Sequence, residues 1–147
     1  MSGIENAISS FRKNFNCAQS IFSSYAPQYG LDKDTALKIA TGFGGGMGRM
    51  QNTCGAVSGA FMVIGLRYGM GLKDDTEVKE KTYQVIREFS SRFQKIHGSI
   101  ICRELLDCDI NTPEGRDYYD QNDFFEKKCF QYVKDSAMIL DEILSKD

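Results

Sequence analysis

Five cysteines are the side chains of this sequence best suited to chemistry: Cys17, Cys54, Cys102, Cys108 and Cys129. No two of them form a Cys-x-x-Cys pair, so any joint chemistry must be assembled by the fold rather than by a short loop. Cysteines that a fold gathers can exchange disulfides or bind a metal through their thiolates. The sequence therefore directs attention first to thiol, disulfide and metal chemistry.

A glycine-rich run precedes one of these cysteines. The run Gly42-Phe43-Gly44-Gly45-Gly46-Met47-Gly48 is soon followed by Cys54-Gly55-Ala56-Val57-Ser58-Gly59. Glycine-rich backbone exposes N–H groups that can surround an anion, a sulfide or the edge of a cofactor. A phosphate-binding loop is excluded because no Gly-Lys-Ser/Thr follows, but a plain flexible connector stays open. The groups expected to contribute to a site around Cys54 are the N–H groups of Gly45, Gly46 and Gly48 and the side chain of Arg49.

The length and cysteine count indicate a small intracellular domain. With 147 residues the chain is close to the commonest domain size, so we expect one domain spanning residues 1–147. An odd number of cysteines in a chain of this length argues against a secreted disulfide scaffold. The N-terminus has no basic segment followed by an apolar one. We therefore expect a cytoplasmic protein without a signal peptide.

The charge pattern gives no reason to expect nucleic acid or a membrane as partner. The chain has 18 basic and 20 acidic side chains and a net charge of −2, whereas nucleic acids and anionic membranes attract strongly basic surfaces. The longest apolar stretch, residues 56–66, is interrupted by serine and glycine. It falls well short of the roughly 20 residues that span a bilayer.

Hydrophobic periodicity predicts an all-α fold. Apolar residues recur every three or four positions through most of the chain, as in the stripe that contains Phe89, Phe93 and Ile96. The helices expected from such stripes and from capping residues span residues 4–25, 32–41, 54–68, 75–96, 100–106 and 123–144. We therefore expect a single-domain bundle of five or six helices, with the glycine-rich loop before the third.

The expected helices place the cysteines in different settings. Cys17 lies beside the apolar stripe of the first helix, in its C-terminal third, and Cys129 lies on the stripe of the last. Cys54 is expected at the start of the third helix and Cys102 in the first turn of a short one. The positive end of a helix dipole stabilises a thiolate and lowers the pKa of the cysteine. We therefore expect Cys54 to be the most reactive thiol and Cys102 the second.

The segments around the cysteines resemble a known family. Cys54-Gly55-Ala56-Val57-Ser58-Gly59 fits the Cys-Gly-Ala-x-x-Gly motif of the redox-active protein family labelled C_GCAxxG_C_C. Further similarity lies in residues 16–20, 44–49 and 102–106 and in the helix that contains Cys129. The resemblance extends from about Asn14 to Leu144, which is nearly the whole chain.

This resemblance implies a small redox protein with four shared cysteines, which here are Cys17, Cys54, Cys102 and Cys129. It also implies a redox partner protein. A related helical module is similar to the N-terminal part of a split-Soret cytochrome, which points to an iron–sulfur centre. The sequence has no Cys-x-x-Cys-His, so covalent haem attachment is not expected. Cys108 is extra to the family pattern and is open to three interpretations: a second-site ligand, a resolving thiol or a residue without a role.

Three functions stay open at this point. In the first, clustered cysteines carry out thiol–disulfide exchange or electron transfer, with Cys54 as the thiolate and another cysteine resolving it. In the second, the four thiolates bind zinc or an iron–sulfur cluster, although such ligand sets usually include a close pair. In the third, the cysteines belong to the core of a non-catalytic partner-binding module. Whether the chain is an enzyme or forms a homo-oligomer stays open as well.

Two other groups are expected to be structural. His97 is the sole histidine and stands at the end of an expected helix, so we expect it to cap the last carbonyls rather than to bind metal. The polar and aromatic residues 117–120 are expected to form a solvated turn rather than the rim of a site.

Overall fold

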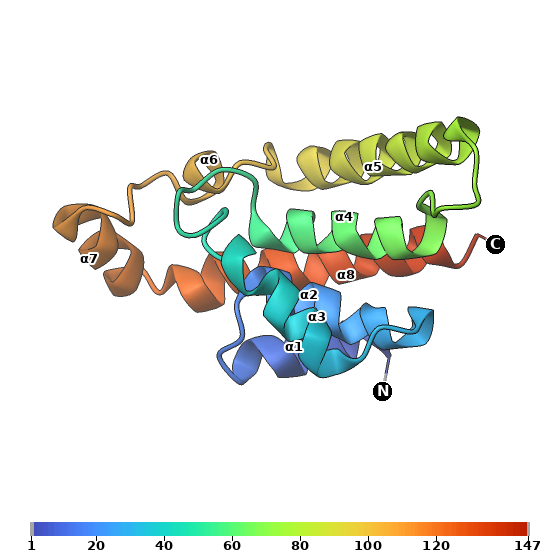
Figure 1. Ribbon diagram of the computed structural model, residues 1–147. Coiled ribbons are helices and arrows are strands. Elements are labelled where there is room, and N and C mark those ends of the chain that lie inside the picture. Colours follow the sequence, from blue (N-terminus) through green and yellow to red (C-terminus); the bar gives the residue numbers. More distant parts are fainter. Residues whose placement is uncertain (1, 147) are drawn as a thin grey trace.

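The computed structural model describes residues 2–146, and their regular structure is helical (Figure 1). The α-helices are α1 (Gly3–Arg12), α2 (Cys17–Tyr25), α3 (Lys33–Ala40), α4 (Gly55–Tyr68), α5 (Thr76–His97), α6 (Cys102–Leu106), α7 (Pro113–Gln121) and α8 (Phe130–Leu144). The connections include two 3₁₀ turns, η1 (Ala26–Tyr29) and η2 (Thr41–Phe43), and a π-helical turn, η3 (Phe125–Cys129). The prediction of an all-α fold is confirmed, but there are eight α-helices in the described range rather than five or six.

The predicted helix over residues 4–25 is in fact two helices. Asn14 has a φ of 71°, a left-handed conformation that ends the first helical segment. Asn16 then starts α2 with a capping box: its side chain accepts a hydrogen bond from the N–H of Gln19, and the Gln19 side chain accepts one from the N–H of Asn16. Two consequences follow. The glycine-rich run precedes the fourth helix rather than the third, and Cys17 is the first residue of α2 rather than part of a C-terminal third.

Capping residues set most other helix starts where the sequence predicts them. Asp32 caps α3 and Asp75 caps α5, each through a carboxylate that accepts a backbone N–H. Pro113 occupies the first turn of α7, a helix that is not among those predicted. Helix α4 begins one residue later than predicted, because Cys54 itself occupies the N-cap position.

Helix α4 runs through the middle of the bundle. It packs against α2, α5 and α8, and α1 packs against α2 and α8 (Figure 1). The first six residues of α4 are all buried, and its later residues Val63 and Ile64 are buried as well. Phe89 and Phe93 of α5 are fully buried as predicted, but Ile96 from the same predicted stripe is 57% exposed. The stripe therefore ends before the last turn of α5.

The elements that contain or flank the cysteines meet at one end of the bundle. The glycine-rich run, α6, α7 and the N-terminal end of α4 lie together there (Figure 1). None of the nine residues of α7 is buried, so this helix is a peripheral element. No helix among residues 2–146 is long and apolar enough to cross a bilayer.

Candidate functional site

Four cysteines line a single cavity of about 230 Å³. Each comes from a different element: Cys17 from the start of α2, Cys54 from the N-cap of α4, Cys102 from the start of α6 and Cys129 from the end of η3. All five cysteines of the chain are free thiols. We call this space the cysteine cavity. The fold thus gathers residues that are up to 112 positions apart in the sequence (Cys17 to Cys129).

The Cys-Gly-Ala-x-x-Gly motif has a physical explanation in the contact between α2 and α4. A Cβ atom on Gly55 would lie 3.2 Å from Cys17 Cβ, and one on Gly59 would lie 2.9 Å from the carbonyl oxygen of Ala18. These two glycines stand one helical turn apart, so together they let the backbone of α2 lie directly on α4. The close approach brings Cys17 next to the end of α4 that Cys54 caps.

The glycine-rich run forms another wall of the cysteine cavity, and its backbone has an unusual conformation. Five consecutive residues, from Gly45 to Arg49, have φ between 58° and 71°. This left-handed region disfavours side chains by about 1–2 kcal/mol per residue, which explains the abundance of glycine here. Gly46 is further constrained because a Cβ atom would lie 2.7 Å from Cys102 Cβ. Gly45, Gly46 and Arg49 line the cysteine cavity, whereas Gly48 lies outside it.

A short antiparallel pairing holds Cys54 and Cys102 side by side. The N–H of Cys54 donates to the carbonyl of Ile100 at 2.8 Å, and the N–H of Cys102 donates to the carbonyl of Asn52 at 2.7 Å. Thr53 and Ile101 form the isolated bridge between these bonds. The two thiols are therefore fixed by backbone hydrogen bonds and not by side-chain packing alone.

Cys129 is positioned by the π-helical turn η3. A π turn inserts an extra residue into a helix and changes which side chains face a given side, and such turns are frequent at functional sites. Cys129 is half-buried, and its thiol interacts with that of Cys17, which is half-buried as well, so that each shifts the pKa of the other. The Tyr119 hydroxyl lies 3.5 Å from Cys129 Sγ. Cys129 therefore interacts with side chains from two other elements, α2 and α7.

These contacts shift the pKa values of the two half-buried thiols in opposite directions. The hydrogen bond from Cys17 lowers the pKa of Cys129, and Tyr119, Lys128 and Arg116 act in the same direction against the effect of burial. The same hydrogen bond, together with burial, raises the pKa of Cys17 well above its ordinary value. Of the pair, Cys129 is the more acidic thiol and Cys17 the less acidic one.

The pKa values of the two buried thiols, Cys54 and Cys102, are raised, whereas the sequence predicts that they are lowered. Burial raises the pKa of Cys54 to about 12, although the N–H groups of Ala56 and Val57 at the start of α4 partly offset it. Burial also raises the pKa of Cys102 to about 11. The prediction that Cys54 has the lowest pKa and Cys102 the next lowest is therefore wrong, because desolvation outweighs the helix dipole at both positions.

Several residues that line or support the site were not predicted. Tyr119 and Arg116 come from α7, where Arg116 lies over the Tyr119 ring at 5.0 Å. The expectation that residues 117–120 form a solvated turn is wrong, because they belong to α7 and Tyr119 lines the cavity. Buried Gln51 bonds the carbonyl of Cys108 and the N–H of Ile110, and it also contacts the Cys102 thiol. Only structure reveals Gln51, because nothing in its sequence context distinguishes it from a surface residue.

Cys108 and His97 lie outside the cysteine cavity. Cys108 is 9% exposed, and burial raises the pKa of its thiol. His97 does not cap α5, because its Nε2 atom lies 2.9 Å from the Asp135 carboxylate. Both residues are therefore part of the framework around the site.

The donor set does not form a site for a single metal ion among the described residues. Among residues 2–146, no group of three or more His, Cys, Asp or Glu side chains converges closely enough to hold one ion, as a zinc site with sulfur about 2.3 Å from the metal requires. In an iron–sulfur cluster each cysteine binds a different iron or shares one, so the ligating sulfurs surround a larger core. Four thiols around a cavity of about 230 Å³, together with two arginines and no carboxylate among the described lining residues, suit that larger, thiolate-bound group.

An all-α fold in which four cysteines from separate elements line one cavity defines a class of small cysteine-centred helical proteins. The model of the family described as Putative redox-active protein (C_GCAxxG_C_C) matches residues 15–143, and the chain belongs to this family. Comparison with curated proteins finds no match, and comparison with solved structures finds none either.

Proposed function

We propose that this chain is a thiol–disulfide redox protein in which Cys129 and Cys17 form a reversible disulfide. The observation that carries the proposal is that the two half-buried cysteines line the same cavity, where each thiol shifts the pKa of the other. Two cysteines can form a disulfide where their Cα atoms lie about 4.4–6.8 Å apart. The family description as redox-active supports the same chemistry.

The exchange with a partner disulfide has two balanced steps. The Cys129 thiolate attacks one sulfur of the partner disulfide, which forms a mixed disulfide and releases the partner's other sulfur as a thiolate. Cys17 then gives its proton to that thiolate and attacks Cys129 Sγ. The Cys17–Cys129 disulfide forms, and the partner leaves with both of its sulfurs reduced. Tyr119 and Arg116 favour the thiolate form of Cys129 in the first step.

Cys54 and Cys102 support this reaction without joining it. Their raised pKa values keep them protonated near neutral pH, and a thiol is a far weaker nucleophile than a thiolate. Both are buried, whereas Cys17 and Cys129 reach solvent. They therefore do not compete for the partner disulfide.

Mild oxidation of the reduced protein with diamide tests the proposal. Peptide mapping by mass spectrometry should find Cys17 linked to Cys129, with the loss of two hydrogen atoms. Cys17→Ser and Cys129→Ser should lose this link. Cys108→Ser should keep it, because Cys108 lies outside the cysteine cavity. Linkage of any other pair in the unaltered protein would refute the assignment.

Binding of an iron–sulfur cluster is a second candidate function, favoured by the four thiols that line one cavity. Cys17, Cys54, Cys102 and Cys129 would be its ligands, and the cluster would supply one-electron transfer. Arg49, Arg116 and the helix N-termini would offset the negative charge of four thiolates. The left-handed backbone of Gly45 and Gly46 would allow a bulky group to lie against the chain without side-chain interference.

Anaerobic purification separates the two candidates. Bound iron and sulfide, with visible absorption that is lost in each of the four cysteine variants, would establish the cluster. Colourless, iron-free protein that still forms the Cys17–Cys129 disulfide would establish thiol exchange. Cys108→Ser is the matched control in both measurements.

A further inference from the structure

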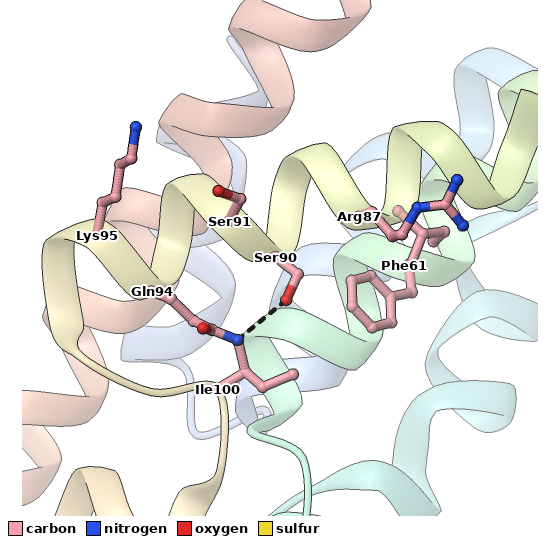
Figure 2. A pocket seen from close by; sticks show the side chains of 8 residues that line it. Phe61, Arg87, Ser90, Ser91, Gln94, Lys95 and Ile100 are labelled. Carbon is pink, nitrogen blue, oxygen red and sulfur yellow. Dashed lines mark hydrogen bonds between the residues drawn. The ribbon is translucent and has the colours of Figure 1, made fainter.

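A second depression of the surface lies between α4 and α5, away from the cysteine cavity. It has a volume of about 590 Å³, and we call it the α4–α5 groove. Figure 2 shows Phe61 of α4 and Ile100 on one side of it and the side chains of α5 along the other. Phe61, Ile86 and Ile100 are partly exposed and give the groove an apolar floor.

Two cations stand at the ends of the groove. Arg87 and Lys95 are exposed, and Figure 2 shows them well apart on α5, with the Ser90–Gln94 hydrogen bond between them. Eight residues of helix separate them, which corresponds to about 12 Å along the axis. Among the described lining residues there is no carboxylate, so the only charged side chains that line the groove there are these two cations.

These cations differ from the other arginine on the same part of α5. Arg92 bonds Glu88 at 2.8 Å and Glu142 at 3.0 Å, so its charge is compensated within the fold. Neither Arg87 nor Lys95 forms an ion pair with any residue in the range 2–146. Arg92, which faces α8, therefore has its charge compensated by carboxylates, whereas Arg87 and Lys95, which flank the groove, do not.

The floor of the groove is directly connected to the cysteine cavity. Ile100 lines the groove, and its carbonyl accepts the N–H of Cys54 at 2.8 Å. Two residues further on, Cys102 lines the cysteine cavity. One short segment thus has the groove on one side and the buried thiols on the other. A molecule in the groove would therefore lie against the segment that holds Cys54 and Cys102 in place.

We infer that the α4–α5 groove is the docking surface for the redox partner protein, and that the partner contributes an extended acidic segment. The matching segment has the pattern Glu-x-Leu-x-Glu. In a strand these three side chains share one face, and the two carboxylates stand about 13 Å apart. They would pair with Arg87 and Lys95 while the leucine covers Phe61, Ile86 and Ile100. The inference rests on the proposed redox function, for which it specifies the partner.

A peptide titration tests the surface directly. The probe is acetyl-Thr-Glu-Thr-Leu-Thr-Glu-Thr-amide, added to the full-length ¹⁵N-labelled protein and followed by assigned backbone amide shifts. We expect shifts at Ser90, Gln94, Lys95 and Ile100. The apparent Kd should weaken by about tenfold between roughly 20 and 200 mM NaCl, because exposed charge pairs are screened. The same peptide with glutamine in place of both glutamates should produce no saturating shifts.

Matched charge variants complete the test. The double variant Arg87→Glu/Lys95→Glu should lose the shifts. Lys73→Glu/Lys81→Glu, which changes the net charge equally at exposed positions outside the groove, should keep them. Absence of shifts at the groove, equal binding of the glutamine peptide, or binding that does not respond to salt would overturn the inference. Diamide-driven formation of the Cys17–Cys129 disulfide, measured in the same variants, reports on the redox proposal separately, because diamide needs no docking surface.

Discussion

One side of the cysteine cavity, formed by Cys17 and Cys129, is half-exposed, whereas the opposite side, formed by Cys54 and Cys102, is buried. On the exposed side, hydrogen bonds between side chains lower the pKa of one thiol. On the buried side, backbone hydrogen bonds and glycines fix the thiols, and burial raises their pKa values. The comparison indicates that the exposed side governs reactivity and that the buried side governs whether the cavity forms at all.

The largest effect is expected on the buried side, for Gly46→Ala. A Cβ atom there would lie 2.7 Å from both Cys102 Cβ and Gln51 Cα, at a φ of 70°. Left-handed strain and overpacking together should reduce the free energy of unfolding by about 2–5 kcal/mol. Gly48→Ala is the matched control, because its φ is 58° but its nearest neighbour would be 3.9 Å away. Equal urea midpoints for the two variants would contradict the role given to Gly46.

The next effect concerns the α2–α4 contact. Gly59→Ala would place a Cβ atom 2.9 Å from the Ala18 carbonyl oxygen, so we expect a loss of about 1–2 kcal/mol after the gain in helix propensity is subtracted. Gly65→Ala in the same helix meets no atom within 4 Å and should stabilise the protein by about 1 kcal/mol. Thermal or urea unfolding measures both. The close approach of α2 to α4 would be disproved if both substitutions changed the free energy of unfolding in the same direction.

On the exposed side, Cys17→Ala should slow the alkylation of Cys129 by iodoacetamide near neutral pH by about tenfold, because it removes a hydrogen bond to a charged sulfur. The pH dependence has a definite sign. A lowered pKa keeps Cys129 a thiolate at more acidic pH in the unaltered protein than in the variant. Cys108→Ala should leave the profile unchanged. In the unaltered protein Cys54 and Cys102 should react more slowly than Cys129, since burial raises their pKa values to about 12 and about 11.

The smallest effect is expected for Tyr119→Phe, which removes the hydroxyl that lies 3.5 Å from Cys129 Sγ. A hydrogen bond of this length is weak, so alkylation of Cys129 should slow only about twofold. The free energy of unfolding should hardly change, because α7 has no buried residue. Tyr118→Phe, at an exposed neighbouring position outside the cysteine cavity, is the control. An equal change in both variants would remove Tyr119 from the site.

Much of the fold was predictable from local sequence signals. Asp32 and Asp75 mark helix starts, and Phe89 and Phe93 mark a buried stripe, because capping and periodicity depend on neighbouring residues. The break between α1 and α2 was missed. It depends on a left-handed Asn14, and the apolar stripe continues across it without interruption.

The sequence predicts which cysteines belong to the candidate site but not the order of their pKa values. The family pattern names Cys17, Cys54, Cys102 and Cys129, and all four line the cavity. Their relative pKa values depend on burial and on contacts between remote elements, such as Cys17 with Cys129 and Tyr119 with Cys129. Sequence reasoning could weigh the helix dipole at Cys54 but not the desolvation that outweighs it.

The left-handed run from Gly45 to Arg49 has a consequence for how the protein loses its function. A segment wound against the natural hand of L-amino acids does not hold its shape alone; its neighbours must impose it. This stretch could relax if α2 or α6 loosened, or if residues 52–54 lost their pairing with residues 100–102. The sulfurs would then move apart while most of the bundle stays folded. Ageing or heated samples should therefore lose their redox behaviour before they lose their helical signal.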